Sequence, residues 1–467
     1  MARCVDMAPG LLNEVGFLVG NDRFLAHLEA KPALRIDSGR VFFDKDLTQE
    51  YIDAFIAKAT AALDDRKPVT IPDAWSAGTA GYSMMTIDVA TEQLREATCQ
   101  DLRDMISLAN ASGIGGSYMV MPQDVPPLMR TIACFKICYE SSDTIRPYDY
   151  QQPEQLPFLY DMHQVMERTM DITITIPAAF SIDAKDLDIF LDYYPMWKKH
   201  GDIRFRTLDY PMLGITKPIT VPGCAAVCFA ETLAVHILFN LFDPEIDMSI
   251  SVSGGHPTDM RNTCWAFGSP RYHLFRYLNE MILPNLCGQK PAQYICSGVR
   301  LETASPAIDE QAAMEKMATG LLAAMQGARS FGYAGVLCVD DVYSGTQFII
   351  DLEIIEYIRE TIEAFDPHPD IINTNGLYEE CKQAATGSDT FISSINTATR
   401  FRHILPSSDL MVREKVRSWL GHQKLLKDRA REIALDRIRN AEPFHLPDDK
   451  QKELNTIYAR AETALPQ

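Results

Sequence analysis

The segment DITITIP, residues 171–177, is followed by a helical pattern at 183–199 and then by IRFRTLDY at 203–210. The two outer segments are rich in β-branched or aromatic residues, which is typical of strands, and the middle one has apolar residues at helical spacing. A helix between two strands makes a crossover connection, and crossovers join parallel strands. This unit therefore predicts a parallel α/β sheet.

The same alternation continues over most of the chain after residue 113. Further strands are expected at SYMVMP (117–122), TIRPYDY (144–150), DMSISVS (247–253), AQYICS (292–297) and YAGVLCV (333–339), with helical runs at 223–242, 269–285, 309–329 and 346–365. Seven strands with long crossovers favour a (β/α)8 TIM barrel over an open doubly wound sheet. No G-x-G-x-x-G follows a strand to support a dinucleotide-binding fold, and the eighth strand is not placed.

Three regions are expected along the chain. Residues 1–110 form an N-terminal α+β cap, residues 111–405 the TIM-barrel catalytic domain, and residues 406–467 a C-terminal helical extension dense in charge. For the extension, a solvated surface and a contact with a subunit or partner both remain open, so a homo-oligomer is one of the alternatives.

Composition excludes several classes of function. The 467 residues are 46% hydrophobic and 23% charged, as in a soluble globular protein. The net charge of -19 and the lack of a Lys/Arg cluster argue against nucleic acid as a partner. The apolar run at 224–242 contains Glu231, His236 and Asn240, so it is interpreted as a buried helix rather than a membrane span. The N-terminus lacks a secretory signal, which predicts a cytoplasmic protein.

The eleven cysteines include no C-x-x-C motif. Cys134 with Cys138, and Cys224 with Cys228, are four residues apart, a spacing that could place two thiolates on one helix face. No His or Cys pair completes a four-ligand zinc set, so core packing is favoured and no metal site is predicted.

The stretch SVSGGHPTDMRNTCWAFGSPRY, residues 251–272, places two glycines directly after an expected strand. Gly254 and Gly255 would allow close approach of a ligand or of another backbone segment. In a parallel barrel the active site lies at the carboxyl ends of the strands. Aromatic residues are frequent at these ends, where their faces could surround a quaternary ammonium group by cation–π attraction, although packing in loops and core is an equally simple role. The aromatic candidates for substrate binding are Tyr148, Tyr210, Trp265 and Tyr343.

The charged candidates follow the same strand ends. Arg300 and Arg261 could each hold a carboxylate through a bidentate fork, or could form structural ion pairs. His256 is a candidate acid or base because it follows the two glycines. Asp340 and Asp341 are adjacent, so at most one of them faces the site, and Asp340 is taken as the second catalytic candidate.

The chain contains no nucleophile elbow, P-loop or H-E-x-x-H motif, so the usual residues for hydrolysis, phosphoryl transfer or zinc chemistry are missing. The difficult chemistry could instead come from a cofactor supplied by another protein.

Several motifs in order resemble those of the trimethylamine methyltransferase superfamily. They are LLNEVGFLVGNDRFLAHLEA, VMPQDVPPLMR, LDYPMLGITKPITVPGC, GGHPTDMRNTCWAFGSPR, ASPAIDEQAAMEKMATGLLAAMQGAR, GTQFIIDLEIIEYIRETIEAF and TRFRHILPSSDLMVREKVRSWL. The resemblance implies a barrel enzyme that passes a methyl group from a methylated amine to the Co(I) corrinoid (cobalamin) of a separate corrinoid protein. No cofactor would be tightly bound to this chain.

No residue of this chain can be pyrrolysine, so the chain is similar to the non-pyrrolysine branch of the superfamily, whose members use betaines. The resemblance thus implies a small quaternary amine as methyl donor in one-carbon metabolism. Gly332 stands where many relatives have His in an H-G-A-G turn, and CSGVRLET replaces their glycine-rich turn, so the pocket is expected to differ. Two alternatives stay open: a cofactor-free barrel lyase or aldolase, weakened by the lack of a Lys at any strand end, and a non-catalytic betaine-binding homologue.

Overall fold

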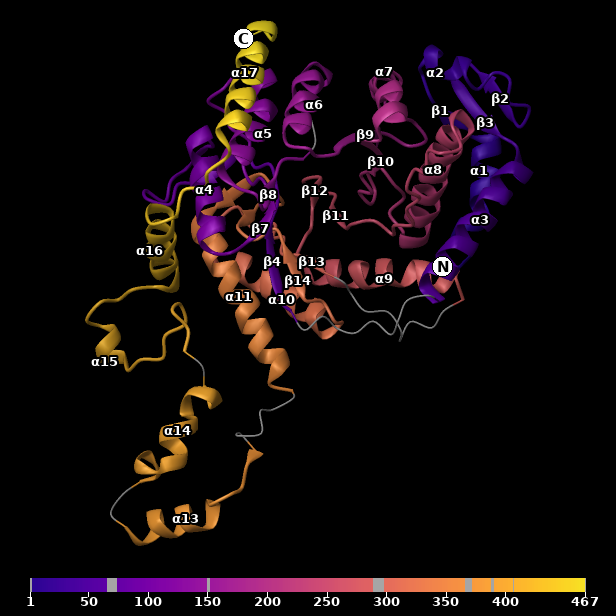
Figure 1. Ribbon diagram of the computed structural model, residues 1–467. Helices are drawn as coiled ribbons and strands as arrows, with labels where there is room; N and C mark the ends of the chain where they lie inside the picture. The colour runs from indigo at the N-terminus through magenta and orange to yellow at the C-terminus, as the bar shows by residue number, and fades with distance from the viewer. Residues whose placement is uncertain are drawn as a thin grey trace.

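The computed structural model describes residues 2–64, 74–148, 152–288, 298–365, 372–387, 390–405 and 407–466. Within these residues the chain is a mixed α/β protein in which helices surround parallel strands (Figure 1). The prediction of an α/β class with parallel sheets is confirmed.

Five strands form one parallel sheet, in the order β13-β14-β4-β7-β8. Their bounds are β4 (Ser76–Thr79), β7 (Gly115–Ser117), β8 (Ile145–Arg146), β13 (Val299–Arg300) and β14 (Ser330–Gly332). Each pair of neighbours is parallel, so the chain crosses back between them. The crossover helices are α4 (Cys99–Ala111), α5 (Arg130–Ser141) and α10 (Glu310–Met325).

A second parallel pair consists of β9 (Met170–Ile176) and β10 (Ile203–Asp209), joined by α7 (Ala184–His200). Burial alternates along β9, so that its isoleucines point into the core. The helix begins at Asp183, whose side chain accepts a hydrogen bond from the backbone N–H of Lys185, and it ends at the left-handed Gly201. The strand–helix–strand unit predicted from residues 171–210 is confirmed.

The segment 247–253 does not form the expected strand. Its backbone groups bond to side chains of helix α8 (Val221–Phe242) instead of to a neighbouring strand. The hydroxyl of Thr232 accepts from the N–H of Ser251 at 3.0 Å, and Nδ1 of His236 lies 2.8 Å from the carbonyl oxygen of Met248. This prediction was wrong because the helix side chains satisfy the hydrogen bonds that a sheet ladder would have made.

Strand β4 was not predicted from the sequence. Its four residues have little apolar character, yet it pairs with β14 on one side and β7 on the other. The expected strand at 292–297 lies outside the described residues, and 333–339 gives only β15 (Val336–Leu337), in an antiparallel hairpin with β16 (Val342–Ser344). Hydrogen bonds among the described strands do not close a ring, so the (β/α)8 barrel stays a prediction.

The N-terminal region combines helices with a small antiparallel sheet of order β1-β3-β2. Its elements are η1 (Ala2–Met7), α1 (Ala8–Glu14), β1 (Phe17–Leu18), α2 (Asp22–Ala26), β2 (Leu34–Asp37), β3 (Arg40–Phe43) and α3 (Lys45–Asp64). Helices α1 and α3 pack on α8, while β4 belongs to the main sheet. The division of the chain into three domains, with a boundary at 110, stays a prediction.

Helix α8 is the one described helix that is long and apolar enough to cross a membrane, and most of its apolar window is buried inside the protein. Its sequence is apolar on all sides because it is enclosed by η1, α1, α3 and β10. The interpretation of 224–242 as a buried helix is confirmed.

The C-terminal residues are helical and lie against the main body. Helix α16 (Leu426–Arg439) packs on α4 and on α11 (Gly345–Glu363), while α17 (Asp448–Ala464) packs on α5 and α6 (Leu156–Val165). These helices bury Ala430, Ala434 and Leu454. The other helices are η2 (Pro127–Met129), η3 (Pro153–Gln155), α9 (Pro270–Leu286) and α15 (Val416–Trp419).

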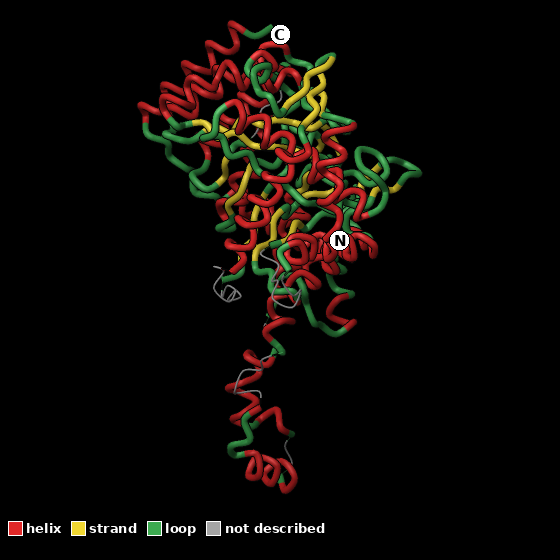
Figure 2. The backbone as a smooth tube through the Cα atoms, turned by 90° about the vertical axis from the view of Figure 1, so that its right-hand side faces the viewer, coloured by secondary structure: helices red, strands yellow, loops and turns green. Residues whose placement is uncertain are grey.

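One part of the chain projects away from this body. Helices α13 (Leu377–Thr386), η5 (Phe391–Ser393) and α14 (Ile395–Ile404) extend beyond the end of α11, as Figures 1 and 2 show from two sides. We call residues 372–405 the arm.

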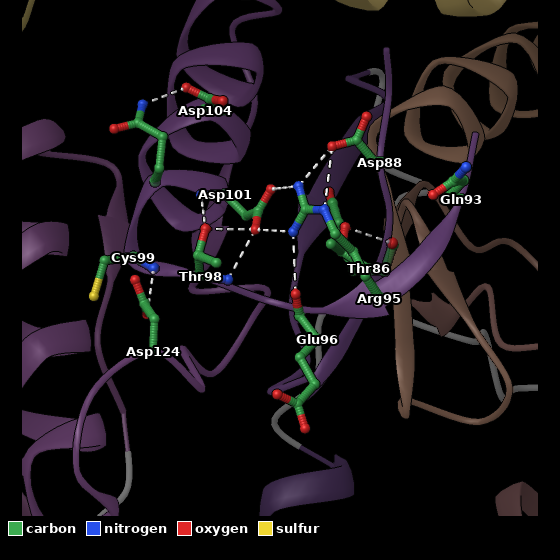
Figure 3. A network of polar contacts seen from close by, with 12 residues as sticks. Thr86, Asp88, Gln93, Arg95, Glu96, Thr98, Cys99, Asp101, Asp104 and Asp124 are labelled. Carbon is green, nitrogen blue, oxygen red and sulfur yellow. Dashed lines mark hydrogen bonds and ion pairs between the residues drawn. The ribbon is translucent and has the colours of Figure 1, made fainter. Parts of the chain in front are cut away.

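A charged network fixes the hairpin of β5 (Met85–Ile87) and β6 (Leu94–Glu96) to the start of α4 (Figure 3). Arg95 binds Asp101 through both terminal nitrogens and reaches Asp88 at 2.6 Å. Asp101 also closes a capping box with Thr98. Asp124 accepts from the backbone N–H of Cys99 at 2.9 Å. These contacts give Arg95 and the three aspartates structural roles.

Candidate functional site

An arginine and a glutamate lie together where β13 leaves the sheet. The ladder to β14 continues through a 2.9 Å bond from the N–H of Leu301 to the carbonyl of Gly332, so Arg300 and Glu302 extend from the same face. Nη2 of Arg300 lies 3.0 Å from Oε1 of Glu302. Nη1 of Arg300 donates to the Tyr333 hydroxyl at 3.1 Å, and the guanidinium stacks 4.7 Å from the Tyr333 ring centroid.

Aromatic rings gather beside this pair. The hairpin of β11 (Thr258–Asp259) and β12 (Cys264–Trp265) carries Trp265, whose ring centroid is 5.1 Å from that of Phe267. The Phe267 ring lies 5.3 Å from Tyr272 and 5.4 Å from His256. The Arg300 guanidinium is 5.8 Å from the Phe267 centroid, which joins the aromatic group to the charged pair.

Burial and charge shift the acidic groups of the site. Burial raises the pKa of Glu302 to about 7, against the opposing effect of Arg300. Burial, with the neighbouring charge of Asp341, also raises the pKa of Asp340. Burial alone would lower the pKa of Arg300, but Glu302 and Tyr333 raise it above its usual value. A fixed cation thus stands beside two carboxyl groups whose pKa values are raised.

His256 is held in a neutral state. Burial, aided by the positive charge of Arg300, lowers its pKa to about 4. Its backbone N–H donates to the carbonyl of Pro211 at 3.0 Å, which fixes the residue beside the end of β10. The ring can therefore serve as a packing surface or a neutral hydrogen-bonding group near pH 7, but it is a weak base.

A pocket of about 320 Å³ opens next to Arg300 and Tyr333, and its walls include Tyr272 and Arg276 of α9 together with Ala80 after β4. Three buried polar atoms of the same cluster have no hydrogen-bond partner among the described residues: Nδ1 of His256, Nε1 of Trp265 and Oε2 of Glu302. Buried polar groups are usually bonded, so such a concentration is typical of a site that binds a polar ligand or ordered water.

The structure brings together four of the eight residues singled out from the sequence: His256, Trp265, Arg300 and Asp340. Of the other four, Tyr148, Arg261 and Tyr343 have their observed contacts outside this group, whereas Tyr210 adjoins Pro211, which bonds the backbone of His256. Tyr148 stacks on Tyr118 at 4.9 Å and donates to the carbonyl of Gly81. Tyr210 is partly exposed, and its carbonyl accepts from the Thr216 hydroxyl.

Arg261 and Tyr343 occupy opposite environments. The Arg261 side chain is 89% exposed on the hairpin and binds Asp259 at 2.6 Å. Tyr343 is fully buried in the core, against Gly335, where burial raises its pKa well above the usual value. Neither side chain reaches the cluster around Arg300 through a contact that we observe.

The two glycines serve close packing rather than an open cradle. A Cβ on Gly255 would lie 2.7 Å from Sγ of Cys224 and 2.9 Å from the carbonyl oxygen of Pro211, and the residue has φ of +79°. Asn279 of α9 accepts from the N–H of Gly254 at 2.7 Å and donates to the carbonyl of Gly255 at 3.0 Å. Glycine is needed because a helix side chain approaches the backbone here.

Sequence reasoning missed Glu302 and Tyr333. Glu302 could have been found from its place two residues after Arg300, because alternate residues of an extended segment share a face. Tyr333 adopts a positive φ of 64° after β14, and no local pattern signals that its ring returns over Arg300.

A buried lysine also escaped the sequence analysis. Lys217 lies in the loop after β10, with its Nζ 2.7 Å from Oδ1 of Asp209 and 2.6 Å from Oε2 of Glu231. Burial alone would lower the pKa of Lys217, but the two carboxylates raise it above the usual value. The ammonium group is therefore charged and paired with two acidic side chains.

The cysteines at 134, 138, 224 and 228 are all buried and unpaired, and burial raises the pKa of each thiol. In the part of the chain that the structure describes, no three His, Cys, Asp or Glu side chains gather in a way that could hold a metal ion. These four cysteines occupy core positions, the alternative that the sequence favoured.

Parallel strands whose carboxyl ends carry a partly exposed arginine, carboxyl groups and aromatic rings define an α/β protein with a site for a small charged ligand. The sequence profile of the trimethylamine methyltransferase (MTTB) family matches residues 203–466, which is more than half of the chain, and the protein belongs to this family.

A curated relative covers the same portion. The protein is similar to "Trimethylamine methyltransferase MttB" of Desulfitobacterium hafniense (strain DSM 10664 / DCB-2), with 26% identity over 263 residues, which is 55% of this chain and 49% of the relative. The chain thus spans about half the length of the curated relative that it matches.

Proposed function

We propose that this protein is a methyltransferase that moves a methyl group from a quaternary amine of betaine type to the Co(I) corrinoid of a separate corrinoid protein. Membership of the trimethylamine methyltransferase family supports methyl transfer from a methylated amine. The observation that carries the narrower substrate class is Arg300, a partly exposed guanidinium surrounded by aromatic rings at the edge of a pocket.

The substrate would be held at both ends. Its carboxylate would bind Arg300, whose side chain is 44% exposed and has donors beyond those used by Glu302 and Tyr333. Its ammonium group would lie against the ring of Tyr272, which lines the pocket, and that of the half-buried Trp265, where cation–π attraction replaces lost hydration. Asp340, the nearby carboxyl group, would offset part of the repulsion between the ammonium group and Arg300.

The transfer requires alignment more than proton transfer. The carbon–nitrogen bond breaks with its electron pair going to nitrogen, so the leaving group is a neutral tertiary amine and needs no general acid. The methyl group passes to the cobalt of the partner protein, which supplies the nucleophile. The residues of this chain would act by positioning the donor and by excluding water, and a neutral His256 is consistent with that role.

We also propose that the strands form a (β/α)8 barrel. In chain order the eight positions would be taken by β4, β7, β8, β9, β10, the segment 247–253, β13 and β14, and 247–253 would occupy its position without the hydrogen-bond ladder of a strand. The pairing of β14 with β4 supports this proposal because the last strand of a barrel must meet the first. The corrinoid protein would dock over the strand ends, and the location of both proteins would be the cytoplasm.

The lysines give no support to an aldolase or lyase. Lys217 is charged and bound by two carboxylates, and Lys316 on α10 is fully enclosed with Asp351. A lysine that forms a Schiff base must be both neutral and accessible.

The test is to mix the purified chain with the reduced cognate corrinoid protein and to follow cobalt absorbance with a panel of donors. Glycine betaine represents a quaternary amine with a carboxylate, choline one without it, and trimethylamine a tertiary amine, which is charged in water only through protonation. We expect methylation with the carboxylate-bearing donor, weaker reaction with choline, and none with trimethylamine. Turnover of trimethylamine alone would contradict the quaternary-amine proposal.

A matched pair of variants tests Arg300. Arg300→Ala should lower kcat/KM for the carboxylate-bearing donor by roughly 10- to 100-fold, the usual worth of a charge-assisted hydrogen bond, and leave choline nearly unaffected. Arg23→Ala, which removes an exposed arginine paired with Asp188 and Asp192, is the control. Calorimetric binding of betaines without methylation would favour a non-catalytic binding protein.

A further inference from the structure

The arm is a surface that the other described residues do not cover. Large apolar side chains are exposed along it, among them Leu377, Tyr378, Phe391, Ile392, Ile395 and Phe401. No described residue of α13 or η5 is buried. Apolar surface of this extent on a projecting segment usually marks an interface.

The helices of the arm need such an interface to be stable. Each of α13 and α14 has ten residues, and isolated helices shorter than about 12–15 residues are marginal in water. The contact between them is polar: Nδ2 of Asn396 donates to Oε2 of Glu380 at 2.7 Å. Packing of their apolar sides against another surface would supply the missing stabilisation.

The position of the arm relative to the candidate site indicates which surface could pack against it. Helices α10 and α11 run in the same direction, because Lys316 lies beside Asp351 and a Cβ on Gly320 would lie 2.5 Å from Cδ1 of Ile358. Helix α11 therefore ends where α10 ends, at the amino end of β14. In agreement, the charge of Glu363 near the end of α11 opposes the effect of burial on the pKa of Arg329, which lies just before β14.

The candidate site lies at the other end of the same strands, around Arg300 and Tyr333. A corrinoid protein that receives a methyl group must reach that end. The arm points from the opposite end, so its partner can bind without obstructing the site.

The two main helices of the arm, α13 and α14, carry charges of opposite sign. The first turn of α13 is acidic, with Glu379 and Glu380, whereas α14 carries Arg400 and Arg402. The segment 372–405 contains three acidic residues (Glu379, Glu380, Asp389) and three basic ones (Lys382, Arg400, Arg402), in a chain of net charge -19. It can therefore approach a second copy without the repulsion that two acidic bodies would experience.

We propose that the arm is a self-association element, in which the arms of two copies pack on each other around a two-fold axis with α13 of one copy against α14 of the other. In such an isologous contact every pairing occurs twice, so the acidic helix of each copy meets the basic helix of its partner. The exposed apolar residues of the arm form the centre of this interface, and the methyl-transfer site takes no part in it.

The test is the mass of the full chain in solution, measured by sedimentation velocity at micromolar concentration. The wild-type protein should sediment as a dimer of the 52.4 kDa chain. Ile392→Asp with Ile395→Asp should give monomers, and because these side chains are 81% and 76% exposed, circular dichroism should show a folded body. Met314→Asp, at a 66% exposed apolar residue on α10, is the control and should remain dimeric.

A charge reversal tests the proposed pairing. Glu379→Arg and Arg402→Glu should each weaken dimerisation roughly fivefold, since two-fold symmetry doubles the small effect of an exposed ion pair, and the double reversal should restore it. A monomeric wild-type protein would overturn the proposal. A monomer that forms a complex with the corrinoid protein, lost on Ile392→Asp, would also overturn it and assign the arm to that partner.

Discussion

Nη2 of Arg300 lies 3.0 Å from Oε1 of Glu302, while Oε2 of the same buried carboxyl group has no hydrogen-bond partner among the described residues. Glu302 therefore orients the guanidinium group and at the same time competes with any carboxylate that approaches it. The charge of Glu302 should control how strongly Arg300 binds an anionic group.

The pH dependence of substrate affinity follows from this relationship. The pKa of Glu302 is raised to about 7, so the group becomes neutral as the pH falls below that value. Loss of its charge removes the repulsion against a substrate carboxylate, and the affinity for glycine betaine should increase between pH 8 and pH 6 by calorimetry. Glu302→Gln should bind tightly and equally at both pH values. An affinity that increases with pH in the wild-type protein would contradict this role.

The second prediction concerns the loss of stability when a Cβ atom is added at Gly255. Gly255→Ala should destabilise the protein by several kcal/mol, because the new methyl group would overlap Cys224 and Pro211 in addition to straining a positive φ. Gly113→Ala is the control: its φ is +68°, but nothing lies within 4 Å, so only the strain of about 1 kcal/mol remains. Denaturant unfolding of the two variants measures the difference, and equal losses would refute the close packing.

Much of the fold could be predicted from the periodic spacing of apolar residues and from amino-acid composition. The alternating residues of β9 and the long crossover α7 have clear local signatures, and they were placed correctly. Strand β4 could not be found in the same way, because its register depends on β14, which is more than 250 residues away. The segment 247–253 has the composition of a strand, but its hydrogen bonds go to α8, which only tertiary structure reveals.

The candidate site could be predicted only in part for the same reason. Arg300 and Arg261 have the same chemistry and both follow strand ends, yet one is stacked between aromatic rings and the other is exposed and bound to Asp259. Tyr343 and Trp265 were equal candidates by sequence, and burial separates them. Residue type indicates what a side chain can do, whereas its surroundings are set by contacts between distant segments.

The buried state of His256 gives a third prediction. Its pKa is lowered to about 4 from an ordinary value of 6.5, so below pH 6.5 the unfolded chain binds a proton that the folded chain does not. The wild-type protein should lose stability from this group as the pH falls from about 6.5 to about 4. The free energy of unfolding of His256→Phe, relative to that of the wild type, should be larger at pH 5 than at pH 7. Trp265→Phe, which removes no titratable group, should differ from the wild type by the same amount at both pH values.

The ion pair between Lys316 and Asp351 gives the last prediction. Both side chains are 0% exposed, Nζ lies 2.5 Å from Oδ2, and the same oxygen accepts from the N–H of Gly335. Lys316→Met should cost about 3–5 kcal/mol of unfolding free energy, because it leaves a buried carboxyl group without its counter-charge. Adding Asp351→Asn removes that charge while keeping an acceptor for Gly335, so the double variant should recover part of the loss in a double-mutant cycle. If the stability losses of Lys316→Met alone and Asp351→Asn alone simply add in the double variant, the pair is not coupled. The packing of α10 on α11 must then depend on its apolar contacts alone.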